Sequence, residues 1–310
     1  MKKIAFLFPG QGAQYPGMGK SFFDAFAIAR ETFEEADEIL GENLSKVILE
    51  GPEELLTQTR NSQTAIFVVS MAILRVVRQQ LPEMEPLACS GLSLGEYTAL
   101  CSSNRLSFAE TLKLVQERGR LMNEACVKTA GTMAAVLGMD AAGIEAAVKG
   151  MNGVWVANFN APGQTVISGT KEGIERASVV LKEKGAKRVV PLVVHGAFHS
   201  GLMMSAQEGL SPWIERAPIQ DSETVFVMNV PGRAVKEVAE IKRNLTSQVT
   251  QSIRWEQGIG AMKEMGIELF LEIGCGKTLT GLNKKIGVEG LSIDQVADLD
   301  ALGFSVCNNS

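Results

Sequence analysis

Short apolar runs alternate with longer amphipathic stretches along this chain. The first run, residues 4–8, is continuous and apolar; it predicts a buried strand that ends at Pro9, in a glycine-containing loop. Apolar runs at 224–228 and 268–273 predict two later strands. Apolar residues at helical spacing predict helices over 20–40, 63–80 and 108–126. Strands separated by helices are typical of an α/β fold, whereas the residues beyond 287 show only weak periodicity.

Between residues 131 and 194 the pattern changes to shorter elements. It predicts, in order, a strand, a helix, two strands, a helix and a strand, over 133–137, 141–148, 154–158, 165–168, 171–184 and 187–194. This is the βαββαβ order of a ferredoxin-like unit. We therefore expect a compact insert, residues 129–197, between the two halves of a larger domain, residues 1–128 and 198–310.

The pentapeptide at residues 91–95 carries the strongest chemical signal. It has the form G-x-S-x-G and lies between a short apolar segment and a helix-forming run. That context predicts a nucleophile elbow, a sharp strand-to-helix turn that exposes one serine hydroxyl and leaves room only for glycine beside it. The pentapeptide also occurs by chance in chains of this length, so the flanking strand and helix matter. An elbow would make Ser93 a covalent nucleophile of acyl transfer or acyl hydrolysis.

Composition narrows the class of protein. The 310 residues are 45% hydrophobic and 21% charged, as in an ordinary globular protein with a sizeable core. The net charge of −5 argues against general nucleic-acid binding. The five cysteines are odd in number and contain no C-x-x-C pair, which favours a reduced intracellular protein. Because the first apolar run is too short for a signal peptide and no run reaches the length of a membrane span, we expect a cytoplasmic protein.

A serine nucleophile needs a base, and the chain has only two histidines, His195 and His199. Taken alone, either could be a packed or surface histidine without a role. We favour His199, because it lies beyond the end of the strand predicted over 187–194, where a loop can face a pocket. His195 would lie nearer the body of that strand.

Arg118 is misplaced on its predicted helix. It lies within an apolar stripe at spacings of three and four residues, formed by Leu114, Val115, Leu121 and Met122. Another face looks solvated and carries Lys113, Glu117, Arg120 and Glu124. A guanidinium in an apolar stripe needs an anionic partner, since an unpaired buried charge costs several kcal/mol. A structural salt bridge and a snorkelling side chain are the other interpretations.

Six segments in order resemble one known family. They are residues 9–14, 91–97, 117–119, 158–162, 163–169 and 196–200. Together they look like the malonyl-CoA:acyl carrier protein transacylase family, and the resemblance runs from the first strand to residues 274–276. It implies an α/β-hydrolase-like large domain with a parallel sheet at its core and an inserted ferredoxin-like small domain.

The resemblance also implies roles for particular residues. Ser93 and His199 would form a catalytic dyad, with the backbone carbonyl of Gln248 holding the histidine ring. The backbone amides of Gln11 and Leu94 would form the oxyanion hole, and Arg118 would bind the free carboxylate of the malonyl group. Phe198 resembles the malonyl-selecting members, and the matched pattern adds two further supporting residues, Asn160 and Gln63.

The function implied is transfer of malonyl from malonyl-CoA to the phosphopantetheine thiol of an acyl carrier protein, supplying fatty-acid synthesis. It needs no metal and no cofactor, and involves no nucleic acid or membrane. The alternatives are a freestanding acyltransferase of a polyketide pathway, an acyl hydrolase, and a non-catalytic scaffold that binds carrier protein. Leu92 stands where the family usually has histidine, which leaves the pathway open. A basic cluster in the insert is a candidate docking site for the carrier: Lys182, Lys184, Lys187 and Arg188.

Overall fold

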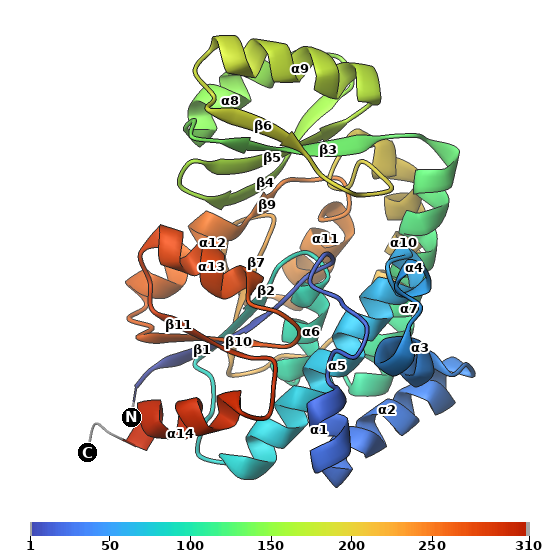
Figure 1. Cartoon of the computed structure of the whole chain (residues 1–310), viewed down its shortest axis with the longest axis vertical. Coiled ribbons are helices and arrows are strands. Elements are labelled where there is room, and N and C mark those ends of the chain that lie inside the picture. The colour runs from blue at the N-terminus through green and yellow to red at the C-terminus, as the bar shows by residue number, and fades with distance from the viewer. Residues whose placement is uncertain (1, 308–310) are drawn as a thin grey trace.

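A six-stranded sheet forms the centre of the larger part of the protein (Figure 1), seen in a computed structural model that describes the backbone of residues 2–307 and the side chains of residues 2–302. The strands follow the order β11 (Gly290–Ile293), β10 (Leu269–Ile273), β1 (Ile4–Phe8), β2 (Ala88–Gly91), β7 (Val225–Met228) and β8 (Arg233–Val235). All neighbours pair in parallel except β7 and β8. The coarse prediction of an α/β fold with a parallel sheet is therefore confirmed.

Both faces of this sheet are buried, which explains the continuous apolar runs of its strands. Alternate residues of β1 point to opposite sides: Phe6 joins the core under helix α5 (Thr59–Gln80), and Leu7 joins a second core. That second core lies beneath helices α12 (Trp255–Glu264) and α13 (Thr278–Ile286), which cover this face in Figure 1. The carboxyl ends of the parallel strands meet at one edge, where α/β proteins gather functional groups.

A five-stranded sheet lies beside the first one. Its order is β6 (Arg188–Pro191), β3 (Thr132–Leu137), β5 (Gln164–Gly169), β4 (Val154–Ala161) and β9 (Ile253–Arg254). Helices α8 (Ala141–Val148) and α9 (Lys171–Glu183) pack on one face, at the top of Figure 1. Apolar residues on the other face belong to the main core, so the two sheets share one packed interior.

This second sheet differs from the sequence prediction at three points. The strand predicted over 154–158 is β4, which continues to Ala161. The strand predicted over 187–194 ends at Pro191, because Val194 donates its amide to the carbonyl of Leu192 in a turn that leaves β3. The third point is β9, which the pattern did not predict. It comes from a distant segment of the chain and pairs in parallel with β4, and its two residues are too short to give a periodic signal.

The helices predicted over 63–80 and 108–126 are α5 and α7 (Phe108–Lys128). The helix predicted over 20–40 is instead two helices, α1 (Lys20–Ala25) and α2 (Ala27–Leu40), because Phe26 between them has an extended backbone. The weakly patterned end forms β11 and α14 (Asp298–Cys307). The remaining helices are α3 (Leu44–Glu50), α4 (Glu53–Leu56), α6 (Gly95–Ser102), α10 (Met204–Arg216), α11 (Val238–Ser247) and the 3-10 turn η1 (Gly201–Met203).

Within the described part of the chain, no helix combines the length and apolar character needed to cross a membrane. Cys89, Cys101, Cys126 and Cys275 are free thiols. The fifth cysteine, Cys307, has a side chain outside the described residues.

A substitution at Gly95, in the first turn of α6, tests how closely that helix approaches β1. A Cβ atom added at Gly95 would lie 2.0 Å from the carbonyl oxygen of Phe8. We expect Gly95→Ala to lower the free energy of unfolding in urea by about 3 kcal/mol, since backbone must move. Gly281→Ala is the matched control, because a Cβ there meets nothing within 4 Å inside α13; it should be neutral or stabilise by up to about 1 kcal/mol. Equal stability of the two variants would contradict the close approach.

Candidate active site

Ser93 lies at the turn between β2 and α6, at the carboxyl edge of the main sheet. Its φ of 55° is in the left-handed region, which non-glycine residues seldom adopt. Two hydrogen bonds hold this backbone: the Ser93 amide donates to Asn229 Oδ1 at 2.7 Å, and Gln248 Nε2 donates to the Ser93 carbonyl at 2.8 Å. A Cβ added at Gly91 would lie 2.1 Å from the backbone of Gly95. The turn therefore requires glycine on both sides of the serine.

His199 is the histidine that contacts Ser93. Its Nε2 lies 2.8 Å from Ser93 Oγ, and its Nδ1 lies 2.8 Å from the backbone carbonyl of Gln248. Because a carbonyl oxygen can only accept, Nδ1 carries the proton and Nε2 is left to accept from the serine hydroxyl. Burial, with the nearby charge of Arg118, lowers the pKa of His199 to about 4. The ring is thus a neutral base at neutral pH.

Arg118 reaches the same hydroxyl from α7. Its side chain is 1% exposed, and Nη2 donates to Ser93 Oγ at 3.1 Å and to Gln248 Oε1 at 2.9 Å. Nη1 donates to Gln63 Oε1 at 2.5 Å, and the guanidinium carbon lies 5.3 Å from the Tyr97 ring centre. Among the described residues no carboxylate forms an ion pair with Arg118, and its Nε has no partner. Burial also lowers the pKa of Arg118. The Arg118 guanidinium is therefore shielded from solvent, hydrogen-bonded only to neutral acceptors, and still able to bind an anion.

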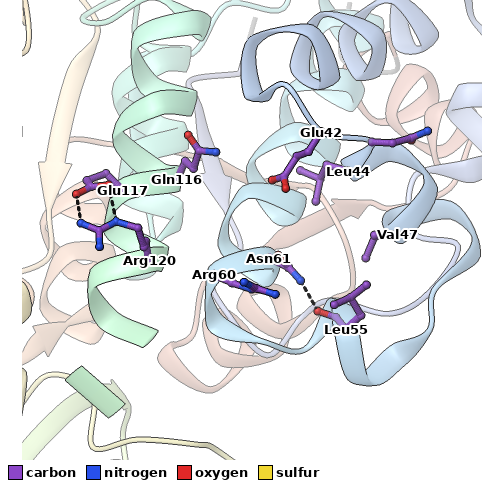
Figure 2. Close-up of a pocket in the computed structure, with 10 residues that line it drawn as sticks. Glu42, Leu44, Val47, Leu55, Arg60, Asn61, Gln116, Glu117 and Arg120 are labelled. Atoms are coloured by element: carbon purple, nitrogen blue, oxygen red, sulfur yellow. Dashed lines mark hydrogen bonds and ion pairs between the residues drawn. The ribbon is translucent and has the colours of Figure 1, made fainter. Parts of the chain in front are cut away.

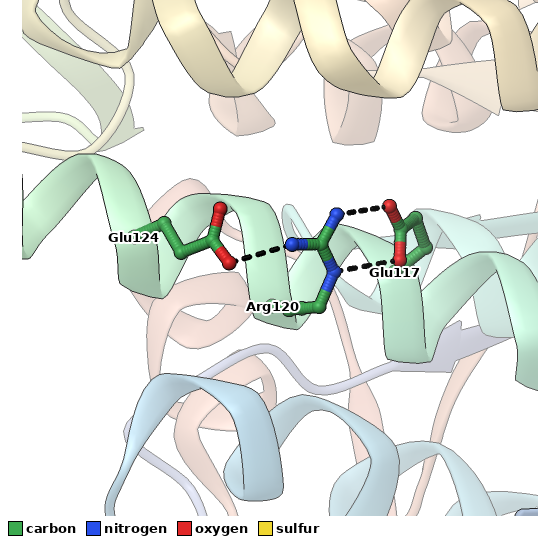
Figure 3. Close-up of polar contacts among 3 residues, drawn as sticks. All are labelled: Glu117, Arg120 and Glu124. Atoms are coloured by element: carbon green, nitrogen blue, oxygen red, sulfur yellow. Dashed lines mark hydrogen bonds and ion pairs between the residues drawn. The ribbon is translucent and has the colours of Figure 1, made fainter.

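The rest of α7 follows the predicted faces. Leu114, Val115 and Met122 are buried beside Arg118, whereas Leu121 is only partly buried. On the exposed face Arg120 pairs with Glu117 at 2.5 Å and with Glu124 at 2.6 Å (Figure 3). One helix thus carries a solvated arginine and, two residues earlier, a buried one.

A cavity of about 560 Å³ opens beside Ser93 and His199. It is lined by residues of the five-stranded sheet and of the loops after β1, β2 and β6, among them Gln11, Asn158, Asn160, Val166 and Phe198. His195 also lines this cavity, but its side chain is exposed. Leu94 is buried directly after the serine, and Gln63 is buried against Arg118. The site residues expected from the sequence therefore lie around this cavity or contact residues that line it.

A second cavity of similar volume lies away from this site. Leu44, Val47 and Leu55 form its apolar wall, with Arg60 and Glu117 among its polar residues (Figure 2). It contains none of the residues around Ser93. Over the described residues, no group of three or more histidine, cysteine, aspartate or glutamate side chains could hold a metal ion.

Two residues at the site were missed by the sequence analysis. Glu96 follows the G-x-S-x-G motif, is 0% exposed, and accepts from the Asn229 amide at 2.6 Å and from Gln248 Nε2 at 2.7 Å. Burial raises the pKa of Glu96 to about 7, against those hydrogen bonds and the charge of Arg118. Asn229 follows β7, and its Nδ2 donates to the Gly91 carbonyl at 2.8 Å. A carboxylate inside an otherwise buried helical run was the available signal for Glu96; no local pattern marks Asn229.

Comparison with known proteins places this chain in a family. The family model described as an acyl transferase domain matches residues 5–286. The malonyl CoA-acyl carrier protein transacylase of Bacillus subtilis is 43% identical over 290 residues, covering 92% of this chain and 91% of that protein. The polyketide biosynthesis protein ThaF of Burkholderia thailandensis is 39% identical over 91% of this chain and 24% of its own length.

Solved structures agree with this assignment. An acyl carrier protein S-malonyltransferase from Vibrio cholerae superposes with a TM-score of 0.92 at 38% identity, covering 97% of this chain and 99% of that one. A malonyl-transacylase in complex with its type II PKS acyl-carrier protein gives a TM-score of 0.92 at 35% identity, covering 96% of this chain and 98% of that one. This chain, whose imidazole and buried guanidinium both contact one serine hydroxyl, belongs to the acyl transferase domain family and, within it, to the malonyl CoA-acyl carrier protein transacylases.

Proposed function

We propose that this enzyme transfers the malonyl group from malonyl-CoA to the phosphopantetheine thiol of an acyl carrier protein, through an ester on Ser93. The observation that carries the proposal is that one hydroxyl oxygen, Ser93 Oγ, lies 2.8 Å from a neutral imidazole and 3.1 Å from a buried guanidinium. The first group activates a nucleophile, and the second recognises a carboxylate next to the carbon under attack. The relative from Bacillus subtilis named above is a malonyl CoA-acyl carrier protein transacylase.

The reaction has two balanced halves. In the first, His199 Nε2 takes the Ser93 proton while Oγ bonds to the thioester carbon; the C–S bond then breaks and the proton passes to the CoA sulfur. In the second, His199 takes the proton of the phosphopantetheine thiol, whose sulfur attacks the ester. The C–O bond breaks, and the proton returns to Ser93. The backbone amides of Gln11 and Leu94 are the proposed oxyanion donors, supported by their places after β1 and after the nucleophile.

Arg118 is the proposed carboxylate clamp. Its planar fork suits a carboxylate, and an acetyl group would leave the guanidinium dry and without an anion. Gln63 supports the assignment, because it accepts from the other terminal nitrogen of the guanidinium, Nη1. Phe198 forms part of the cavity wall, where its bulk would limit branched acyl groups. Asn160 lines the same cavity with a buried oxygen that has no hydrogen-bond partner among the described residues, an acceptor available to the substrate.

The finer description of the fold is part of the proposal. We assign residues 1–128 and 198–310 to an α/β-hydrolase-like domain with a nucleophile elbow at Ser93, and 129–197 to a ferredoxin-like insert. The order β3–α8–β4–β5–α9–β6 supports the insert, although β9 adds a fifth strand from the larger part. The exposed cluster of Lys182, Lys184, Lys187 and Arg188, at the end of α9, in the following turn and at the start of β6, is the proposed docking surface for an acidic carrier.

Supply of a polyketide pathway is the second candidate function, favoured by the similarity to ThaF and to a transacylase bound to a type II PKS carrier. Transfer rates to purified carriers of the two kinds would separate the candidates. Either pathway would place the enzyme in the cytoplasm with no cofactor of its own. A hydrolase would instead release free malonate as the main product.

Mixing the protein with malonyl-CoA should add one malonyl group to the intact mass, and Ser93→Ala should prevent it and lower transfer by about 10⁴-fold or more. Carrier protein should then discharge the labelled protein. His195→Gln is the matched control, because that histidine also lines the cavity but makes no contact with Ser93 in the described structure. Full activity in Ser93→Ala would overturn the mechanism.

Arg118→Ala should lower kcat/KM for malonyl-CoA by about 10²-fold, the effect of losing charge-assisted hydrogen bonds, while acetyl-CoA is used as well as before or better. Arg120→Ala, two residues along the same helix on its solvated face, should change neither rate. An unchanged malonyl/acetyl ratio in Arg118→Ala would remove the clamp.

Protonation of His199 should weaken the fold at acidic pH. Its pKa of about 4 in the folded state is below the value of about 6.5 for a free imidazole, so the unfolded chain binds the proton more readily between these values. Stability from this group is present above pH 6.5 and is lost as the pH falls toward 4. Relative to His199→Gln, the wild type should lose about 2 kcal/mol between pH 7 and pH 5 in urea unfolding. Parallel loss in both proteins would contradict the lowered pKa.

A further inference from the structure

Glu96 lies directly beneath the turn that carries Ser93, on the first turn of α6. It is fully buried, and each carboxylate oxygen accepts one hydrogen bond: Oε1 from the backbone amide of Asn229, and Oε2 from the side-chain amide of Gln248. Neither the proposed chemistry nor the carboxylate clamp uses this group. A buried carboxylate is costly to keep, so its contacts indicate what it does.

The Glu96 carboxylate and the Ser93 carbonyl, which both accept from Nε2, together decide which way the Gln248 amide points. An ionised carboxylate only accepts, so the NH₂ group of Gln248 must face Glu96. The amide oxygen of Gln248 is then turned to the other side, where it accepts from Arg118 Nη2 at 2.9 Å. With the reverse orientation, two donors would face each other at Arg118 and two acceptors at Glu96. Glu96 thus acts on the guanidinium without touching it.

We propose that Glu96 is a positioning residue for substrate selection, an inference that rests on the proposed function. Through the amide of Gln248, Glu96 orients the Arg118 guanidinium toward the acyl carboxylate. Gln63 fixes the other end of the fork, so the guanidinium has one plane and one direction. Only an acyl group with a free carboxylate benefits from that direction. Glu96 also supports the Ser93 backbone, through Asn229 and Gln248, which serves every acyl group alike. The malonyl/acetyl ratio therefore isolates the selection role from general support.

Glu96→Gln tests this role with no change in size. The Asn229 amide still needs an acceptor, so the new side chain would turn its oxygen to Asn229 and its NH₂ to Gln248. Gln248 would then present its oxygen to residue 96 and its NH₂ to Arg118, and it would lose its hydrogen bond to the Ser93 carbonyl, which affects every acyl group alike. We expect the ratio of kcat/KM for malonyl-CoA to that for acetyl-CoA to fall about tenfold, the effect of one lost hydrogen bond to a charged group. Assays at pH 8 keep Glu96 ionised in the wild type, since burial raises its pKa to about 7.

The matched control is Glu272→Gln. Glu272 is equally buried, at the end of β10, and its oxygens accept from the backbone amides of Leu279 and Thr280 at 2.9 and 2.7 Å. It makes no hydrogen bond to the residues around Ser93. This variant should lose stability in urea but keep the wild-type malonyl/acetyl ratio. A drop in the ratio that is the same in both variants would overturn the proposal.

Gln248→Met keeps the test decisive if Glu96→Gln does not fold. Methionine retains the backbone carbonyl that holds His199 but has no amide to orient, so the ratio should fall as it does in Glu96→Gln. In the double variant the two changes should not add, because both act through one amide. A folded Glu96→Gln or Gln248→Met whose ratio stays within about twofold of the wild type would refute the positioning role. Failure of the wild type to take up malonyl at Ser93 would refute the proposed function itself.

Discussion

The first turn of α6 lies against β1 more closely than any side chain permits. A Cβ added at Gly95 would lie 2.0 Å from the Phe8 carbonyl oxygen of β1, and one added at Gly91, at the end of β2, would lie 2.1 Å from the Gly95 backbone. Because β2 passes directly into a helix packed this closely, the turn between them is tight, and Ser93 within it has a left-handed backbone. The exposed hydroxyl is a consequence of close packing, held by hydrogen bonds from segments far away in the chain.

Electrostatics in a dry site explains the rest of the chemistry. His199 is buried and neutral, so it can take a proton; Arg118 is buried and charged but surrounded by neutral acceptors. Glu96 is the carboxylate that could act as a counter-ion to Arg118, but the Gln248 amide lies between them and hydrogen-bonds to both. The separation matters, because a direct ion pair would already satisfy the arginine. The Gln248 amide lets Glu96 orient the guanidinium, and the positive charge of Arg118 stays available to the carboxylate of an acyl group.

The two sheets hold the site from both sides. The main sheet brings the loop after β1, Ser93 after β2 and Asn229 after β7 to one edge. The second sheet supplies Asn160 and the segment that leads from β6 to His199. β9 follows Gln248 by a few residues and pairs with β4, so the segment that contains Gln248 is anchored to the second sheet. The histidine and the carbonyl that orients it are therefore fixed by the same connection between the sheets.

Local signals in the sequence determined much of this protein. Mostly apolar runs predicted strands β1, β7 and β10, periodicity predicted α5 and α7, and the spacing around Arg118 identified a buried arginine. The motif at 91–95 pointed to Ser93, since a tight turn leaves its mark within five neighbouring residues. These features depend on contacts within one element or one turn, where the side-chain pattern and the structure have the same period.

Tertiary structure alone decided the features that depend on distant segments. The sequence favoured His199 over His195 as the base, and packing brings His199 against Ser93, 106 positions away. The extended Phe26, the short strand β9, and the places of Asn229 and Glu96 beneath the turn had no periodic signal. Hydrogen bonds and burial between distant segments depend on the packed interior as a whole. The sequence contains the residues that form these contacts, but its local pattern does not indicate which of them meet.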